Sequence, residues 1–237
     1  MNAPFQVVDL AERFWSAAGA DRTIPANLER AVEASGFLTV LQREDLSVDT
    51  IRRWLGKMSV ACPLNVADRP LRACLVAYDG AGFAFIEKND PDDERRFSLA
   101  HELAHFLADY LAPRDNVSRR IGRSAVQAPD GTRTATPEER VRAWCSRTDL
   151  GVHIHLMDRA VVRMQVREAE ENADRLAYEL LAPATDVLAR ATDAAAAIEL
   201  LIGFYRLPAT QAQRYALLLV PPPRMDPLLA RLRLAPC

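Results

Sequence analysis

The sequence predicts an α+β fold that is mostly helical and contains a small antiparallel sheet. Apolar residues recur at helical spacing through much of the 237-residue chain. Two apolar runs, at 71–78 and 83–87, flank an Asp-Gly turn, and this combination is typical of a β-hairpin. A third run at 150–157 (LGVHIHLM) alternates weakly between apolar and polar residues and predicts another strand.

The composition is that of an ordinary globular protein and excludes several classes. The chain is 49% hydrophobic and 26% charged with a formal net charge of -2, so its charge gives no support to direct binding of nucleic acid or anionic membranes. Its apolar stretches are far shorter than the about 20 residues of a membrane span, and the first residues do not resemble a signal peptide. None of the four cysteines forms a Cys-x-x-Cys pair, which excludes short-spaced zinc fingers and thioredoxin motifs. We therefore expect a cytoplasmic protein with free thiols and no membrane partner.

Helices are expected throughout residues 5–60, and residues 1–66 are assigned to an N-terminal helical region. Ser47 and Asp49 suit the cap and first turn of one of these helices. The expected helices are at 7–18, 28–35 and 48–57.

A buried helix is expected after the hairpin. Asp90-Pro91 suits an N-cap followed by proline at the first helical position, and the helix should run to about residue 110. After Phe97 it is apolar on nearly every side, which is typical of a buried helix. Residues 113–135 lack periodicity and are expected to form a long loop, whereas Thr-Pro-Glu-Glu at 136–139 is a capping box that begins another helix.

The last third of the chain is expected to be helical. Pro183 ends the first helix of this region, and the three prolines at 221–223 end the fold. The tail covers residues 224–237. The expected helices are at 166–181, 192–205 and 210–220.

The buried helix contains His-Glu-Leu-Ala-His at 101–105, a His-Glu-x-x-His motif. On a helix His101 and His105 lie one turn apart on one face, where both rings can reach the same ion. Glu102 is rotated away from the ion but can reach a water molecule bound to it. Two buried histidines satisfied by backbone carbonyls are the alternative, but this would leave two imidazoles and a carboxylate in one apolar helix at considerable cost. The motif therefore predicts a metal site, with Zn²⁺ suited to imidazole ligands.

A catalytic zinc needs a third protein ligand, and the helix at 166–181 supplies the leading candidates. Glu170 interrupts an otherwise apolar stripe of this helix and should point inward. Glu171 is the main rival, but it belongs to an i, i+4 ladder with arginines that predicts an exposed face. His153 and His155 on the strand at 150–157 are the other candidates.

The segments RFSLA-HELAH at 96–105 and EENADRLAYELLAP at 170–183 resemble the motifs of the ImmA/IrrE family of metallo-endopeptidases. The resemblance implies that His101, His105 and Glu170 are the metal ligands, that Glu102 is the general base, and that Asp174 orients a ligand. It also implies a zincin-like metalloprotease domain, which we place at 67–223 with an insertion at about 113–160.

The mechanism expected of such a site is hydrolysis by a metal-activated water. Glu102 would take a proton from that water and pass it to the leaving amine. His153, His155 or Tyr110 could contact the substrate or its oxyanion. A substrate strand could add beside the hairpin, and residues 113–135 are the candidate lid.

The expected function is a zinc-dependent endopeptidase, although ligand type does not exclude Mn²⁺ or Fe²⁺. Its expected partner is a protein substrate, and the resemblance implies a regulatory protein such as a DNA-binding transcriptional repressor. The alternative is a non-proteolytic, metal-stabilised module that acts by binding DNA or a protein. An intact Glu102 favours the peptidase, because a structural metal site does not need it.

Overall fold

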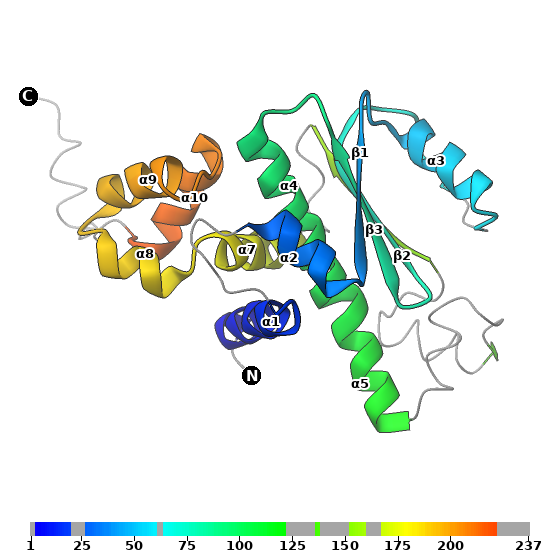
Figure 1. The fold of residues 1–237 in the computed structure, drawn as a ribbon, viewed down its shortest axis with the longest axis horizontal. Helices are drawn as coiled ribbons and strands as arrows, with labels where there is room; N and C mark the ends of the chain where they lie inside the picture. The colour runs from blue at the N-terminus through cyan, green and yellow to red at the C-terminus, as the bar shows by residue number, and fades with distance from the viewer. Residues whose placement is uncertain are drawn as a thin grey trace, which may run out of the picture.

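A four-stranded sheet with helices on both faces forms the centre of the molecule. The structure is a computed structural model, and it describes the following residues: 3–19, 27–60, 64–121, 136–137, 152–159 and 167–221. Helix α3 (Val48–Lys57) covers one face of the sheet, and α4 (Asp92–His105) crosses the other face (Figure 1). The fold is α+β, as the sequence predicts.

The strands lie in the order β1-β3-β2-β4. The predicted hairpin is confirmed, because β2 (Leu71–Tyr78) and β3 (Ala81–Glu87) pair antiparallel around the Asp-Gly turn. The predicted strand near 150–157 is also confirmed as β4 (His153–Asp158), which pairs antiparallel with β2.

The fourth strand corrects the prediction of a purely antiparallel sheet. β1 (Leu38–Arg43) pairs parallel with β3, so the sheet is mixed, and the expectation that residues 5–60 are all helical is wrong at this strand. β1 is short and buries little beyond Leu38. Its partner lies about forty residues further along the chain, so β1 has neither a hairpin turn nor a long apolar run to mark it.

Helix α3 seals one face of the sheet with an apolar cluster of its own. Ser47 caps this helix as predicted, because its hydroxyl accepts a hydrogen bond from the Thr50 N–H at 3.4 Å. Ile51 and Leu55 pack against Cys74, Val76 and Phe85 of the sheet. The buried residues of this cluster are Leu46, Val48, Ile51, Leu55, Leu71, Cys74, Val76 and Phe85.

The larger core lies on the opposite face, between the sheet and α4. Helix α7 (Arg167–Leu181) packs along α4, and α1 (Ala3–Ala17) packs against α7. Helix α2 (Leu28–Ser35) lies beside β1 and α4. The predicted helices at 7–18, 28–35, 48–57 and 166–181 are thus confirmed to within a few residues at their ends.

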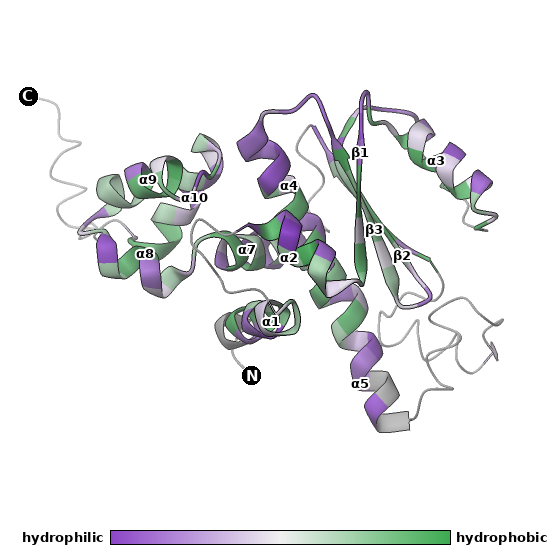
Figure 2. Cartoon of the chain, in the orientation of Figure 1, coloured by the Kyte–Doolittle hydropathy of each residue, from purple (hydrophilic) through white to green (hydrophobic). Residues whose placement is uncertain are grey.

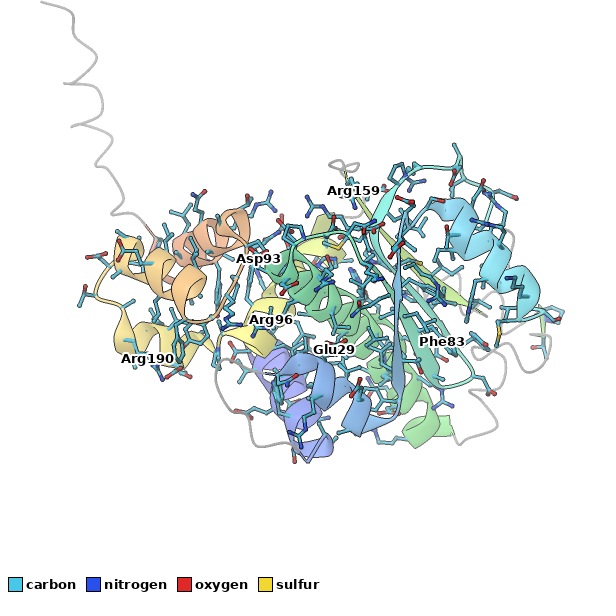
Figure 3. The ribbon with its side chains drawn as sticks, turned by 45° about the horizontal axis from the view of Figure 1, so that its top comes forward. Glu29, Phe83, Asp93, Arg96, Arg159 and Arg190 are labelled. Atoms are coloured by element: carbon cyan, nitrogen blue, oxygen red, sulfur yellow. The ribbon has the colours of Figure 1, made fainter. Side chains whose placement is uncertain are left out.

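The first turn of α4 differs by one residue from the prediction. Pro91 occupies the cap position and the helix begins at Asp92, so Asp90 is not its N-cap. Asp90 instead accepts a hydrogen bond from Arg159 at 2.8 Å, an arginine at the end of β4 that Figure 3 labels. A long-range ion pair has therefore replaced the local cap.

The helix continues beyond the predicted end near residue 110. α4 passes into a π-helical segment at Phe106–Leu111 and then into α5 (Ala112–Ile121). The predicted loop at 113–135 is therefore wrong for 113–121, and its remainder lies outside the described residues. Figure 2 shows that α5 is largely hydrophilic, so it carries no apolar stripe from which a helix could be predicted. The predicted helix opened at 136–139 also lies outside the described residues beyond residue 137.

Three helices complete the chain: α8 (Ala184–Arg190), α9 (Ala194–Gly203) and α10 (Ala209–Leu219). The last two confirm the predicted pair, whereas α8 was not expected. Arg96 of α4 donates a hydrogen bond to the carbonyl of Tyr205 and so fastens α4 to these helices (Figure 3). The predicted tail at 224–237 lies outside the described residues.

Candidate metal centre

The His-Glu-x-x-His motif lies in the buried middle of α4. His101 and His105 are on one face of the helix, and their Nε2 atoms are 3.2 Å apart. Both rings are almost completely buried, and Glu102 between them has no exposed surface. The helical placement that the motif requires is therefore present, with both imidazoles directed at one point.

Glu170 reaches the same point from the first turns of α7. Its Oε2 lies 3.3 Å from Nε2 of His101, and its Oε1 lies 3.7 Å from Nε2 of His105. Glu171, the rival carboxylate, is on the exposed side of α7. Apolar neighbours such as Ala173 and Ala177 turn one face of α7 toward α4, and Glu170 shares that face.

A third histidine completes the group. His155 lies on β4, with its Nε2 3.0 Å from Oε1 of Glu170, and its ring stacks on that of His105 with centroids 3.7 Å apart. Four ligand atoms, from His101, His105, His155 and Glu170, lie within 4.8 Å of one another, which makes them a candidate metal site within the described part of the chain. From the sequence alone, His155 was one of two candidate histidines on the predicted strand at 150–157 and could not be preferred over His153.

The second nitrogen of each ring contacts a carboxylate. Nδ1 of His101 lies 3.0 Å from Asp174, as the family motif implied for that position. Nδ1 of His105 lies 2.7 Å from Asp109, a residue that sequence reasoning missed. Nδ1 of His155 lies 2.9 Å from Oε2 of Glu102. Carboxylates in these positions fix the ring orientation and tautomer of metal-binding histidines.

The electrostatics of the group favour a cation. Burial lowers the pKa of His101, but hydrogen bonds to Asp174 and Glu170 outweigh it and raise that pKa to about 9. Burial likewise lowers the pKa of His155, while the charge of Glu102 and its hydrogen bond raise it to about 10. Burial raises the pKa of Glu170, yet hydrogen bonds from His101 and His155 bring it well below its usual range. The carboxylates around the rings thus favour positive charge at this point, which a divalent metal ion would supply.

His105 behaves differently from the other two rings. Burial lowers its pKa, and the opposing hydrogen bond to Asp109 does not offset this. The positive charges of His155 and His101 lower it further. A neutral imidazole is the form that binds metal, so the lowered pKa of His105 favours metal binding by this ring.

The surroundings of Glu102 are consistent with a bound metal and its water. Oε1 of Glu102 is buried and has no hydrogen-bond partner among the described residues. A buried carboxylate oxygen without a donor is costly, so its neighbourhood suits a water molecule held beside it. Imidazole nitrogens and a carboxylate oxygen are the donor types that zinc takes in proteins. The residues therefore fit a divalent metal of this kind.

Comparison with known families supports the same interpretation. Residues 56–131 match the model of the peptidase family M78, the IrrE N-terminal-like domain. The predicted resemblance to the ImmA/IrrE family is confirmed. The match includes β2, β3 and the whole of α4, and it ends before β4 and α7. A search of curated proteins finds no match.

Within the IrrE N-terminal-like segment, Tyr110 lies apart from the four ligand atoms. Its hydroxyl accepts a hydrogen bond from the Gly80 N–H at 2.8 Å, which holds the hairpin turn against the helix. His153 lies two residues before His155 on β4, and its ring is 6.3 Å from that of Tyr110. The structure thus brings His155 into the cluster and leaves His153 and Tyr110 beside it.

The IrrE-like family and the cluster together indicate a metal-dependent peptidase. Among the helices that the structure describes, each is too short or too polar to cross a bilayer.

Proposed function

We propose that this protein is a zinc-dependent endopeptidase in which Glu102 is the general base. The observation that carries the proposal is Oε1 of Glu102, a buried carboxylate oxygen with no hydrogen-bond partner among the described residues, on a side chain whose other oxygen contacts His155 of the cluster. Oε2 of Glu102 contacts His155 as an orienting carboxylate would, but a purely structural metal site gives no role to Oε1. His101, His105 and Glu170 would hold the metal, and Mn²⁺ or Fe²⁺ would suit similar donors.

Zinc at this site supplies a coordinated water whose pKa falls to about 7, together with polarisation of a carbonyl oxygen. Glu102 accepts a proton at Oε1 and passes it to the leaving amine of the peptide. Asp174 and Asp109 hold the rings of His101 and His105 in one orientation. His153 contacts the substrate beside the site, where its face of β4 is half-buried.

The substrate is proposed to be a regulatory protein such as a DNA-binding transcriptional repressor. This rests on the family resemblance. β4 supports the binding mode, because it is the last strand on its side of the described sheet and pairs only with β2 there. A peptide segment in extended form can add to such a strand through backbone hydrogen bonds, which tolerates many sequences.

Replacing Glu102 by glutamine tests the hydrolytic role. Glu102→Gln should keep the fold and the bound zinc but reduce cleavage by about 10²–10⁴-fold, because the amide cannot accept the proton. Cleavage is measured on a peptide library by mass spectrometry, with zinc content determined on the same samples. Glu171→Gln is the matched control, since this carboxylate of α7 is exposed and is not one of the four residues of the cluster. If Glu102→Gln cleaved peptides as fast as the wild type, the general-base role would be abandoned.

A further inference from the structure

The three histidines of the cluster are equivalent in their contacts. Each presents Nε2 to a common point and Nδ1 to a carboxylate: Asp174, Asp109 and Glu102 respectively. A histidine that binds metal is held in the same manner. His155 therefore has every contact of a metal ligand, although a site of the proposed kind needs only two histidines and Glu170.

The distances between ligand atoms agree with a four-ligand site. Two ligands that each lie about 2.0–2.1 Å from a tetrahedral zinc are about 3.3 Å apart. The Nε2 atoms of His101 and His105 are 3.2 Å apart, Oε2 of Glu170 lies 3.3 Å from Nε2 of His101, and Oε1 of Glu170 lies 3.7 Å from Nε2 of His105. Nε2 of His155 lies 3.0 Å from Oε1 of Glu170, so the two oxygens of this carboxylate face different rings, and all four ligand atoms lie within 4.8 Å of one another. Four protein ligands at these distances leave no coordination position for water, which is the arrangement of closed sites.

We propose that His155 is a fourth metal ligand that closes the site in the resting protein, and that its departure switches the peptidase on. This inference rests on the proposed function, and it adds the regulation of the same site. In the closed state His155 occupies the position that water needs, and its Nδ1 also engages Oε2 of Glu102. One side chain therefore blocks both the metal and the base.

Among the three histidine ligands, His155 is the one placed to leave. His101 and His105 lie on the buried helix α4, and their side chains are 3% exposed. His155 lies on β4, which is held within the described sheet by β2 alone, and its side chain is 13% exposed. Rotation of this side chain disturbs one edge strand, whereas removing either ring of α4 would disrupt the core.

Departure of His155 produces two effects together. A coordination position opens, and Oε2 of Glu102 loses its contact with the imidazole. The base and the open position thus become available in the same movement. A protein segment that pairs with β4 next to His155 could displace this side chain. A substrate or partner that binds this strand would therefore activate the site.

Cobalt substitution tests the ligand assignment without relying on activity. The metal-free protein is loaded with Co²⁺, and its visible spectrum is recorded with and without azide. The wild-type spectrum should not respond to azide, because four protein ligands leave it no position. The His155→Ala spectrum should change on addition of azide. A wild-type spectrum that responds like that of the variant would overturn the proposal.

Zinc affinity gives a second readout, measured by competition with a chelator. His155→Ala should weaken zinc binding by more than about 100-fold, since loss of a ligand costs more than the 10–100-fold typical of a residue that only orients one. His153→Ala is the matched control on the same face of β4 and should keep the wild-type affinity. Unchanged zinc affinity in His155→Ala would assign His155 to substrate contact instead and overturn the proposal.

Hydrolysis separates this inference from the proposed function. His155→Ala with saturating zinc should cleave the peptide library faster than the wild type, and Glu102→Gln in that background should abolish the gain. Loss of cleavage in His155→Ala would overturn the closing role. If the cobalt and zinc results stand but no variant cleaves any peptide, the proposed function fails while His155 remains a ligand, and the protein is a metal-stabilised module.

Discussion

Asp109 lies one helical turn beyond His105, in the π-helical segment that follows α4, with Oδ2 2.7 Å from Nδ1 of His105. The wider turn of a π-helix is frequent near functional sites. The contact orients the ring so that Nε2 points at the cluster. The i, i+4 spacing from His105 was visible in the sequence, and it is the signal by which this residue could have been found.

Asp109→Asn tests this orienting role. The neutral amide of asparagine accepts a weaker hydrogen bond from Nδ1 of His105 than the charged carboxylate does, so the ring is held less firmly and its Nε2 is a weaker ligand. Zinc affinity should therefore fall by about 10–100-fold. Competition with a chelator measures the change. Asp115→Asn is the control, because Asp115 is exposed on α5 and outside the cluster. Equal zinc affinity in the two variants would show that Asp109 does not orient the ligand.

The sequence was most informative where one helix carries the chemistry. His101, Glu102 and His105 follow from a motif on a single helix, and Glu170 follows from the apolar face of α7. His155 could not be distinguished from His153 in this way. Its position depends on the pairing of β4 with β2, where His155 lies opposite Leu75. That register is a tertiary property which a weakly alternating run does not specify.

At the scale of elements, the hairpin and most helices could be predicted because their signals are local. Caps, turn residues and apolar periodicity lie within each segment. β1 and α5 could not, because β1 depends on a distant parallel partner and α5 is mostly polar. Helix α4 also begins at Asp92 rather than at the predicted Pro91, since Asp90 is bound by Arg159 at the end of β4 instead of capping the helix.

Gly82 shows how closely β1, β3 and the end of α4 pack. A Cβ at this position would lie 2.6 Å from Leu38 of β1 and 2.7 Å from Phe106, the residue after His105. Both neighbours are buried. Gly82→Ala should lower the free energy of unfolding by about 1–3 kcal/mol, as expected for overpacking. Chemical denaturation of the purified variant measures this change.

Gly56→Ala is the matched control for that prediction. Gly56 lies in α3, and a Cβ there would meet no atom within 4 Å. Alanine favours the helix over glycine by up to about 1 kcal/mol, so this variant should be slightly more stable than the wild type. If Gly82→Ala gained stability as Gly56→Ala is expected to, the close approach of β1 and Phe106 to this glycine would be refuted.

At the scale of the whole molecule, the cluster joins elements that are far apart in the sequence. His101 and His105 come from α4, His155 from β4 and Glu170 from α7. The last two lie beyond the segment that matches the IrrE N-terminal-like family model. A metal bound by all three elements would therefore connect the sheet with both helices of the main core.

Removal of the metal should destabilise the entire fold. A ligand at 1,000 times its dissociation constant stabilises the folded state by about 4 kcal/mol. In a chain of this size each kcal/mol shifts Tm by about 2–4 °C, so a chelator should lower Tm by about 8–16 °C relative to zinc-saturated protein. Glu170→Ala should show a clearly smaller zinc-dependent shift than the wild type, because it loses one ligand of the cluster, whereas Glu171→Ala should retain the wild-type shift because its side chain is exposed. A Tm that is the same with zinc and with chelator would contradict a metal that links α4, α7 and β4.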